Sequence, residues 1–247
     1  MAFQFYIKII DNYSIRFFSN IPTENLEKSI PECPKYIRNP IGHRNITVVA
    51  PTWSDLVRLY TLSTDITSST TSVRKTFFKL IKPNNMSRKD VGLWGPTDCK
   101  PDEKLAIIVP YRNRDEHLRL FIKHMHEFLR RQQLMYTIFV INQESESKFN
   151  RALLLNVGFI ESYRVAYFDC FIFHDVDLLP EDDRNMYRCS EQPRHLSVSI
   201  DQYNYHFDLL ETAESRFNID GYWTSNYTII KAHSLYNGLI YWISVAV

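Results

Sequence analysis

The sequence predicts an α/β fold, in which an open and mostly parallel sheet is flanked by helices and preceded by an irregular N-terminal arm. Three short apolar runs alternate with two segments of helical periodicity. Because the connections between these segments are short, their order favours parallel strands joined by right-handed crossovers. The chain has 247 residues, of which 45% are hydrophobic, so it is long enough to bury the core of such a sheet.

The first strand is predicted at residues 105–109, a continuous apolar run that Pro110 closes and that is typical of a strand buried on both faces. Asn113 and Glu116 then have the spacing of a capping box, and apolar residues recur at helical spacing to about Gln133. The other predicted elements are, in chain order, a strand at 136–141, a helix at 149–163 and a strand at 170–173. Residues before about 104 show weak periodicity broken by prolines, which predicts an arm with short elements only, such as a helix at about 53–62.

Charge and composition exclude several classes of function. The chain has 29 basic and 28 acidic residues, so no global charge attracts nucleic acid or anionic lipid. Neither G-x-G-x-x-G nor G-x-x-x-x-G-K-[S/T] occurs, and no uncharged apolar run reaches the roughly 18 to 20 residues of a membrane-spanning helix. The four cysteines are widely spaced without a C-x-x-C pair, which disfavours a structural zinc site and leaves two disulfides possible. Sequons for N-glycosylation occur at Asn12, Asn45, Asn85 and Asn226.

Polar segments follow each predicted strand, at residues 111–114, 142–143 and 174–177. Ligands of open parallel sheets bind beyond the carboxyl ends of the strands, so we expect these three segments to share one rim. Three histidines at 117–126 are expected to be solvated on the first helix, and the acidic residues at 181–183 are expected in a solvated loop.

Asp175 and Asp177 are candidate metal ligands on this rim. Strand alternation sends their side chains to opposite sides unless the backbone turns there. Carboxylates select hard cations such as Mg²⁺ and Mn²⁺, which keep open positions for substrate phosphates. The alternative is that both aspartates only cap a turn.

Three arginines, Arg112, Arg114 and Arg151, are candidates for binding a diphosphate, because guanidinium groups match phosphate oxygens in two-point geometry. The alternative for the first two is an ion pair with Asp115 or Glu116 on a solvated face. Two aromatic residues of the same segments, Tyr111 and Phe149, are candidates for stacking on a base, with a place in the core as the alternative.

The string Ile-Ile-Val-Pro-Tyr-Arg-Asn-Arg at residues 107–114 resembles the β-1,4-galactosyltransferase family. The likeness covers about residues 95–203 and fainter segments at 33–34 and 92–99. Its further motifs lie, in order, at 116–118, 131–134, 140–143, 149–152, 155–159, 175–178, 187–189 and 192–195.

This resemblance implies a GT-A fold and a type II membrane protein of the Golgi lumen. Such an enzyme is a hexosyltransferase that moves galactose from UDP-galactose to a terminal N-acetylglucosamine-type acceptor on glycoproteins or glycolipids, with inversion and with Mn²⁺. The residues implied to bind the donor are Pro110, Tyr111, Arg112, Arg114, Phe149, Arg151, Asp175, Val176 and Asp177, with Asp177 as the metal ligand. The implied disulfides are Cys33 with Cys99 and Cys170 with Cys189.

The chain also departs from the family pattern. After about Tyr205 the likeness stops, so no residue is matched to the family's acceptor and general-base loop, and Gln202 stands where the family has a lysine. The family's N-terminal anchor is not visible. We therefore expect an N-terminal arm at 1–100, a nucleotide-sugar-binding core at 101–207 and a divergent tail at 208–247. The alternative function is a catalytically silent UDP-binding module, and the choice between galactose and N-acetylgalactosamine as donor stays open.

Overall fold

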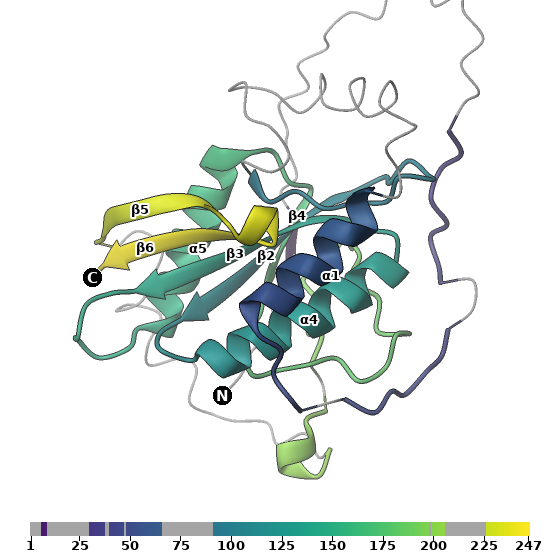
Figure 1. The fold of residues 1–247 in the computed structure, drawn as a ribbon. Helices are drawn as coiled ribbons and strands as arrows, with labels where there is room; N and C mark the ends of the chain where they lie inside the picture. The colour runs from purple at the N-terminus through teal and green to yellow at the C-terminus, as the bar shows by residue number, and fades with distance from the viewer. Residues whose placement is uncertain are drawn as a thin grey trace, which may run out of the picture.

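The computed structural model describes residues 6–8, 30–37, 40–46, 48–65, 91–197, 199–205 and 226–247. In these residues one six-stranded sheet carries helices on both faces (Figure 1). The strands are β1 (Tyr6–Lys8), β2 (Lys104–Tyr111), β3 (Met135–Gln143), β4 (Cys170–Phe173), β5 (Thr228–Leu235) and β6 (Ile240–Ala246). The helices are α1 (Trp53–Asp65), α4 (Asp115–Arg131) and α5 (Arg151–Val165), with short 3-10 turns η1 (Asp201–Tyr203) and η4 (Tyr236–Gly238).

The sheet has the order β1-β4-β2-β3-β6-β5. Strand β2 pairs in parallel with β3 and with β4, and β6 pairs in parallel with β3. The two edge strands, β1 and β5, run antiparallel to their neighbours. The prediction of an open, mostly parallel α/β sheet is therefore confirmed.

Alternation along the central strand divides the core between the two faces. Leu105, Ile107 and Val109 of β2 face α4 and α1, whereas Ala106 and Ile108 face α5. These side chains are fully buried, as expected for a strand covered on both sides. Helices α1 and α4 thus cover one face and α5 the other (Figure 1). Because β2 pairs in parallel with β3 and β4, the carboxyl ends of these three strands lie at one edge of the sheet.

The predicted capping box of α4 is wrong. Asn113 has a φ of 52°, and Arg114, which makes no capping hydrogen bond through its side chain, precedes the helix. The chain leaves β2 through a sharp turn, and asparagine tolerates the left-handed conformation that this turn needs. At α5 the capping residue is Asn150, whose side chain accepts a hydrogen bond from the backbone N–H of Leu153 at 3.0 Å.

The sheet continues beyond the boundary expected at residue 207. Five residues of β6 pair with β3, and β5 completes a hairpin with β6. Trp94 also donates a hydrogen bond from Nε1 to the carbonyl oxygen of Gly238. The described part of the segment 208–247 therefore belongs to the same sheet as the core.

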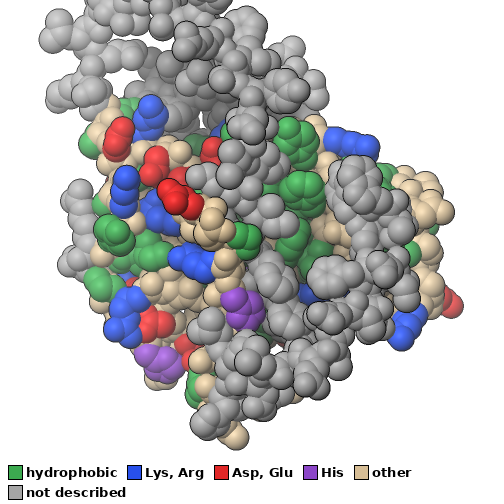
Figure 2. All heavy atoms as spheres, turned by 180° about the vertical axis from the view of Figure 1, so that it is seen from behind, with side chains coloured by type: hydrophobic (Ala, Val, Ile, Leu, Met, Phe, Trp, Pro, Cys, Tyr) green, Lys and Arg blue, Asp and Glu red, His purple; other side chains and the backbone are tan. Residues whose placement is uncertain are grey.

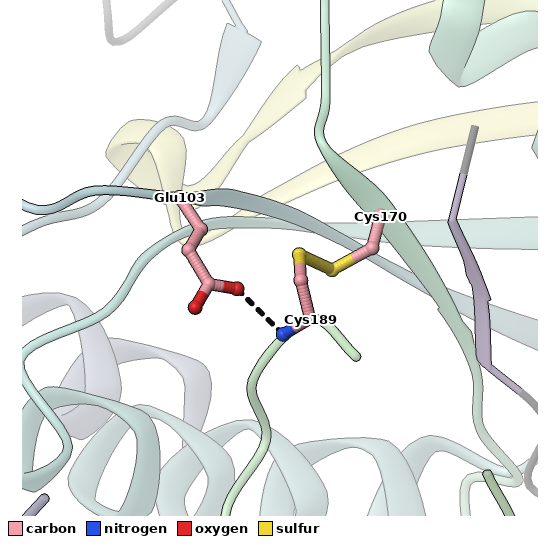
Figure 3. A group of neighbouring side chains, drawn as sticks. All are labelled: Glu103, Cys170 and Cys189. Atoms are coloured by element: carbon pink, nitrogen blue, oxygen red, sulfur yellow. Dashed lines mark hydrogen bonds between the residues drawn. A yellow bond between two sulfur atoms is a disulfide. The ribbon is translucent and has the colours of Figure 1, made fainter. Parts of the chain in front are cut away.

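One disulfide joins two segments that precede β2, and the other joins the first residue of β4 to the segment that follows it. Cys33 is bonded to Cys99 and Cys170 to Cys189, which is the pairing that the resemblance implies. Glu103 accepts a hydrogen bond from the backbone N–H of Cys189 at 2.5 Å (Figure 3). Although this carboxylate and the two sulfur atoms cluster, the sulfurs are bonded to each other, so no thiolate is present to bind a metal ion.

Several charged and polar side chains expected in solvent are buried. Asp183 is fully buried and accepts hydrogen bonds from the backbone N–H groups of Ile41 and Gly42, at 2.9 Å each, and from Arg131. His126 is also fully buried, so it does not lie in solvent on α4.

On the outer surface, acidic and basic side chains are interspersed on the face shown in Figure 2. No helix within the described ranges combines the length and the apolar character that crossing a bilayer requires. Of the four sequons, Asn12 and Asn85 lie outside the described residues.

Candidate functional site

A hollow of about 520 Å³ opens at the carboxyl ends of β2 and β4 and at the start of α5. We call it the donor hollow, after the donor-binding residues that the resemblance implies. It is lined by Pro110, Arg112, Arg114, Phe149, Arg151, Asp175, Val176, Asp177, Leu178, Ile200, Asp201 and Gln202. Of the nine residues that the resemblance places at the donor, eight therefore line one cavity.

Arg151 and Asp175 form a two-point ion pair inside the donor hollow. Nε of Arg151 lies 2.6 Å from Oδ1 of Asp175, and Nη2 lies 3.0 Å from Oδ2. Arg151 is the first residue of α5 and Asp175 follows β4, so the pair connects the helix to the end of the strand. Burial raises the pKa of Asp175, and the hydrogen bonds from Arg151 oppose that rise.

Asp177 lies on a turn, which settles where the two aspartates point. The backbone N–H of Leu178 donates to the carbonyl oxygen of Asp175 at 3.3 Å, so the chain reverses directly after β4. Because of this turn, Asp175 and Asp177 both line the donor hollow despite their i,i+2 spacing. Asp177 is paired with Arg114 at 2.7 Å, and both side chains are about half exposed.

Arg112 organises the loop between β3 and α5. Its Nη1 donates to the carbonyl oxygens of Ser145 and Ser147, at 3.3 and 2.6 Å, and its guanidinium lies 5.3 Å from the centre of the Phe149 ring. The alternative, in which Arg112 or Arg114 forms an ion pair with Asp115 or Glu116, is wrong: within the described residues, Arg112 bonds the loop and Arg114 pairs with Asp177. Asp115 instead bonds Arg119 at 2.7 Å and the indole of Trp53 at 2.9 Å.

The third rim segment, residues 142–143, holds the loop between β3 and α5 through hydrogen bonds of Gln143. Oε1 of Gln143, the last residue of β3, accepts the backbone N–H of Asn150 at 3.0 Å, and its amide nitrogen donates to the hydroxyl of Ser147 at 3.0 Å. Gln143 is almost fully buried. It therefore fixes the loop that carries Phe149 without lining the hollow itself.

Tyr111 is the one predicted donor residue that does not line the hollow. It is 7% exposed and packs edge-on against Trp242, with ring centres 5.3 Å apart. Since successive side chains of a strand point to opposite faces, Pro110 and Arg112 can line the hollow only if Tyr111 faces the α1 and α4 side. Burial accordingly raises the pKa of Tyr111.

A second hollow of about 700 Å³ adjoins the first and shares Asp177, Leu178, Ile200 and Asp201 with it. Its other polar lining residues include His43, His174, Glu181, Asp182, His195 and Tyr205. These residues come from the N-terminal arm, the end of β4 and the irregular segment 177–205, which carry no periodicity. Sequence reasoning therefore missed this hollow.

The sequence profile described as the N-terminal region of glycosyl transferase group 7 matches residues 62–190, slightly more than half of the chain. β-1,4-Galactosyltransferase 2 of Mus musculus is 51% identical over 115 residues, which are 46% of this chain and 31% of that protein. β-1,4-Galactosyltransferase 1 of Bos taurus is 50% identical over 127 residues, which are 51% of this chain and 32% of that protein. The matched part thus spans about a third of the length of these relatives.

Among solved structures, the catalytic domain of Drosophila β1,4-galactosyltransferase 7 in complex with xylobiose matches with a TM-score of 0.43 and 22% identity, covering 59% of this chain and 94% of that one. A mutant of the same protein, in complex with manganese, UDP-Gal and xylobiose, matches equally. The matched profile contains the eight predicted residues of the donor hollow. The chain belongs to the glycosyl transferase group 7 family.

Proposed function

We propose that this chain is a hexosyltransferase that binds UDP-galactose in the donor hollow and transfers galactose, with inversion, to an N-acetylglucosamine-type acceptor. The observation that carries the proposal is the gathering of three arginines and three carboxylates in one cavity at the carboxyl edge of a parallel sheet. Half of the chain is about 50% identical to β-1,4-galactosyltransferases, which supports galactose as the sugar.

The diphosphate would lie among Arg112, Arg114 and Arg151. Their guanidinium groups can each bind phosphate oxygens through two parallel N–H donors. The first turn of α5 adds the positive end of the helix dipole at the same place. Phe149, which is 36% exposed, is placed to stack on the uracil or ribose.

Asp177 is the residue proposed to hold Mn²⁺. Its carboxylate lines the hollow and is 46% exposed, whereas Asp175 is engaged by Arg151. One or two carboxylates together with substrate phosphates are a common ligand set for hard divalent cations, so the donor chemistry fits. When bound, the cation would supply charge stabilisation to the departing diphosphate.

The pairing of Arg114 with Asp177 suggests how ligand binding proceeds in the hollow. At 2.7 Å, each group neutralises the other in the absence of ligand. A diphosphate with its cation would replace this ion pair by two new ones, because the phosphate attracts Arg114 and the cation attracts Asp177. The cavity is thereby kept electrostatically balanced before and after binding.

The proposed location is the lumen of the Golgi, by analogy with the family. Both disulfides support a compartment of the secretory pathway, because such bonds persist in oxidising surroundings and are rare in the cytosol.

Calorimetric titration with UDP, with and without Mn²⁺, tests the donor site. We expect UDP to bind more tightly when Mn²⁺ is present, and Asp177→Asn to abolish that difference. Arg164→Ala, which changes an exposed arginine on α5 away from the hollow, is the matched control.

A transfer assay with radiolabelled UDP-galactose and an N-acetylglucosamine acceptor then separates the two hypotheses. Turnover supports the enzyme, binding without turnover supports the silent module, and no binding contradicts both.

A further inference from the structure

This inference concerns the segment that leads into the edge strand β5, and it rests on the proposed location in the secretory pathway. Asn226, Tyr227 and Thr228 form a sequon for N-glycosylation, and the structure describes all three residues. At least one residue of each of the other three sequons lies outside the described ranges. The surroundings of a complete sequon are therefore known at Asn226.

Exposure alternates along this sequon as it does in a strand. Asn226 and Thr228 are exposed, whereas Tyr227 between them is partly buried. Tyr227 packs against the core cluster on the α5 side of the sheet, and its hydroxyl donates to Oε1 of Glu161 on α5 at 2.8 Å. Because the middle residue is held inward, the side chains of the first and third residues face solvent. A glycan on Asn226 would therefore leave the core undisturbed.

Strand β5 is an edge strand whose first half has little protection against pairing with another chain. Within the described ranges it pairs only with β6, so the backbone groups of its outer side are open (Figure 1). Natural edge strands are blunted by charged side chains and bulges. Here both lie in the middle of the strand, where the register shifts between Ile229 and Lys231. The residues before Lys231 carry no charge, and one of them, Ile230, is 52% exposed.

We propose that Asn226 carries an N-linked glycan and that this glycan shields the uncharged start of β5 from pairing with another chain. A glycan is bulky and solubilising, and its attachment point lies two residues before the strand begins. In the transfer step, Nδ2 of Asn226 forms a bond to the anomeric carbon of an oligosaccharide held on a lipid diphosphate. The bond from that carbon to the phosphate oxygen breaks, and the lipid diphosphate leaves with the electron pair. The amide nitrogen gives up one proton to a base of the transferring enzyme.

The modification is tested on the full chain, purified from the secretory pathway of cultured animal cells. Peptide N-glycosidase in heavy-oxygen water converts a glycosylated asparagine to a labelled aspartate, and mass spectrometry of the peptides should find that label at Asn226. The label should be lost in Thr228→Ala, which keeps the asparagine but breaks the sequon. Thr228→Ser is the matched control and should keep the label, because serine also completes a sequon.

Size-exclusion chromatography with light scattering tests the shielding. Asn226→Gln, which carries no glycan at this site, should shift toward dimers and larger species, whereas Thr228→Ser should elute with the full chain. Adding Ile230→Lys to Asn226→Gln should reverse the shift, because a charge at the open start of β5 disfavours edge-to-edge pairing.

The outcomes separate this inference from the proposals on which it rests. If the disulfide of Cys170 with Cys189 is formed and Asn226 is unmodified, the inference is overturned and the location stands. If both disulfides are reduced and Asn226 is unmodified, the location and the inference are overturned together, while UDP binding tests the donor site independently. If Asn226 is glycosylated and Asn226→Gln elutes with the full chain, the shielding role is overturned.

Discussion

Nε2 of His174 lies 3.0 Å from the hydroxyl of Tyr187, and Nδ1 of the same ring lies 2.8 Å from the carbonyl oxygen of Asp175. A carbonyl oxygen can only accept, so Nδ1 carries the proton and Nε2 accepts from the tyrosine hydroxyl. Both side chains are buried. The ring therefore ties the turn that presents Asp175 and Asp177 to the segment that leads into the Cys170–Cys189 disulfide.

Tyr187→Phe should weaken this connection without changing the packing. The substitution removes the donor and leaves Nε2 of His174 as a buried acceptor, which costs about 1 to 3 kcal/mol of unfolding free energy. We also expect weaker binding of UDP with Mn²⁺, because the turn that carries Asp177 is less well held. Urea denaturation and calorimetric titration measure the two effects. Tyr163→Phe, at an exposed tyrosine of α5, is the control, and equal stability of the two variants would contradict the prediction.

Stability should fall between pH 7 and pH 5 because of two buried histidines. Burial lowers the pKa of His126 to about 3 and that of His174 to about 4, whereas an unfolded histidine titrates near 6.5. Below pH 6.5 the unfolded chain takes up protons that the folded chain does not bind, so acid favours unfolding. Each ring should account for about 2 kcal/mol of unfolding free energy lost between pH 7 and 5.

Urea denaturation at both pH values, at constant ionic strength, measures this loss. His126→Gln lacks one of the titrating rings, so its stability should depend less strongly on pH than that of the full chain. The prediction fails if the full chain is equally stable at pH 5 and pH 7.

The strands of the core could be predicted because burial on both faces leaves a local signal. Each of the apolar runs at 105–109, 136–141 and 170–173 lies within β2, β3 or β4, and the ends differ by two residues at most. The donor hollow could be predicted from the order of these strands, because parallel strands bring the residues that follow them to a common edge. Strand alternation also predicts that Tyr111 faces α1 and α4, whereas the resemblance implied that it binds the donor.

Features that depend on distant partners left no local signal. Asp183 is buried because the backbone N–H groups of Ile41 and Gly42, about 140 residues away, satisfy its carboxylate. His126 is buried because Tyr136 and the carbonyl oxygen of Leu239 bond both nitrogens of its ring. The burial of His126 does not follow from the helical periodicity of α4, and the burial of Asp183 does not follow from the acidic residues around it. The second hollow likewise forms between segments that are far apart in the sequence.

The ion pair of Arg151 and Asp175 should be required more for function than for stability. Arg151→Ala leaves Asp175 in a largely buried position without its partner, which should lower the unfolding free energy by about 2 to 3 kcal/mol. The double variant Arg151→Met/Asp175→Leu removes both charges and keeps most of the volume, so it should recover much of that stability. UDP binding should be lost in both variants. Recovery of UDP binding with stability would contradict the role of Arg151 at the diphosphate.

Gly158 should not tolerate a side chain, although it lies within helix α5. Alanine is normally favoured over glycine inside a helix by about 1 kcal/mol. Here a Cβ atom would lie 2.3 Å from Cγ2 of Ile108 and 2.9 Å from Cγ1 of Ile141, so the helix would have to move away from the sheet. We expect Gly158→Ala to lower the unfolding free energy by about 1 to 3 kcal/mol, measured by urea denaturation.

Because Ile108→Ala opens space at the same contact, adding Gly158→Ala to it should cost little or even restore stability. Equal costs of Gly158→Ala in the two backgrounds would show that the close approach of α5 to β2 is not the cause.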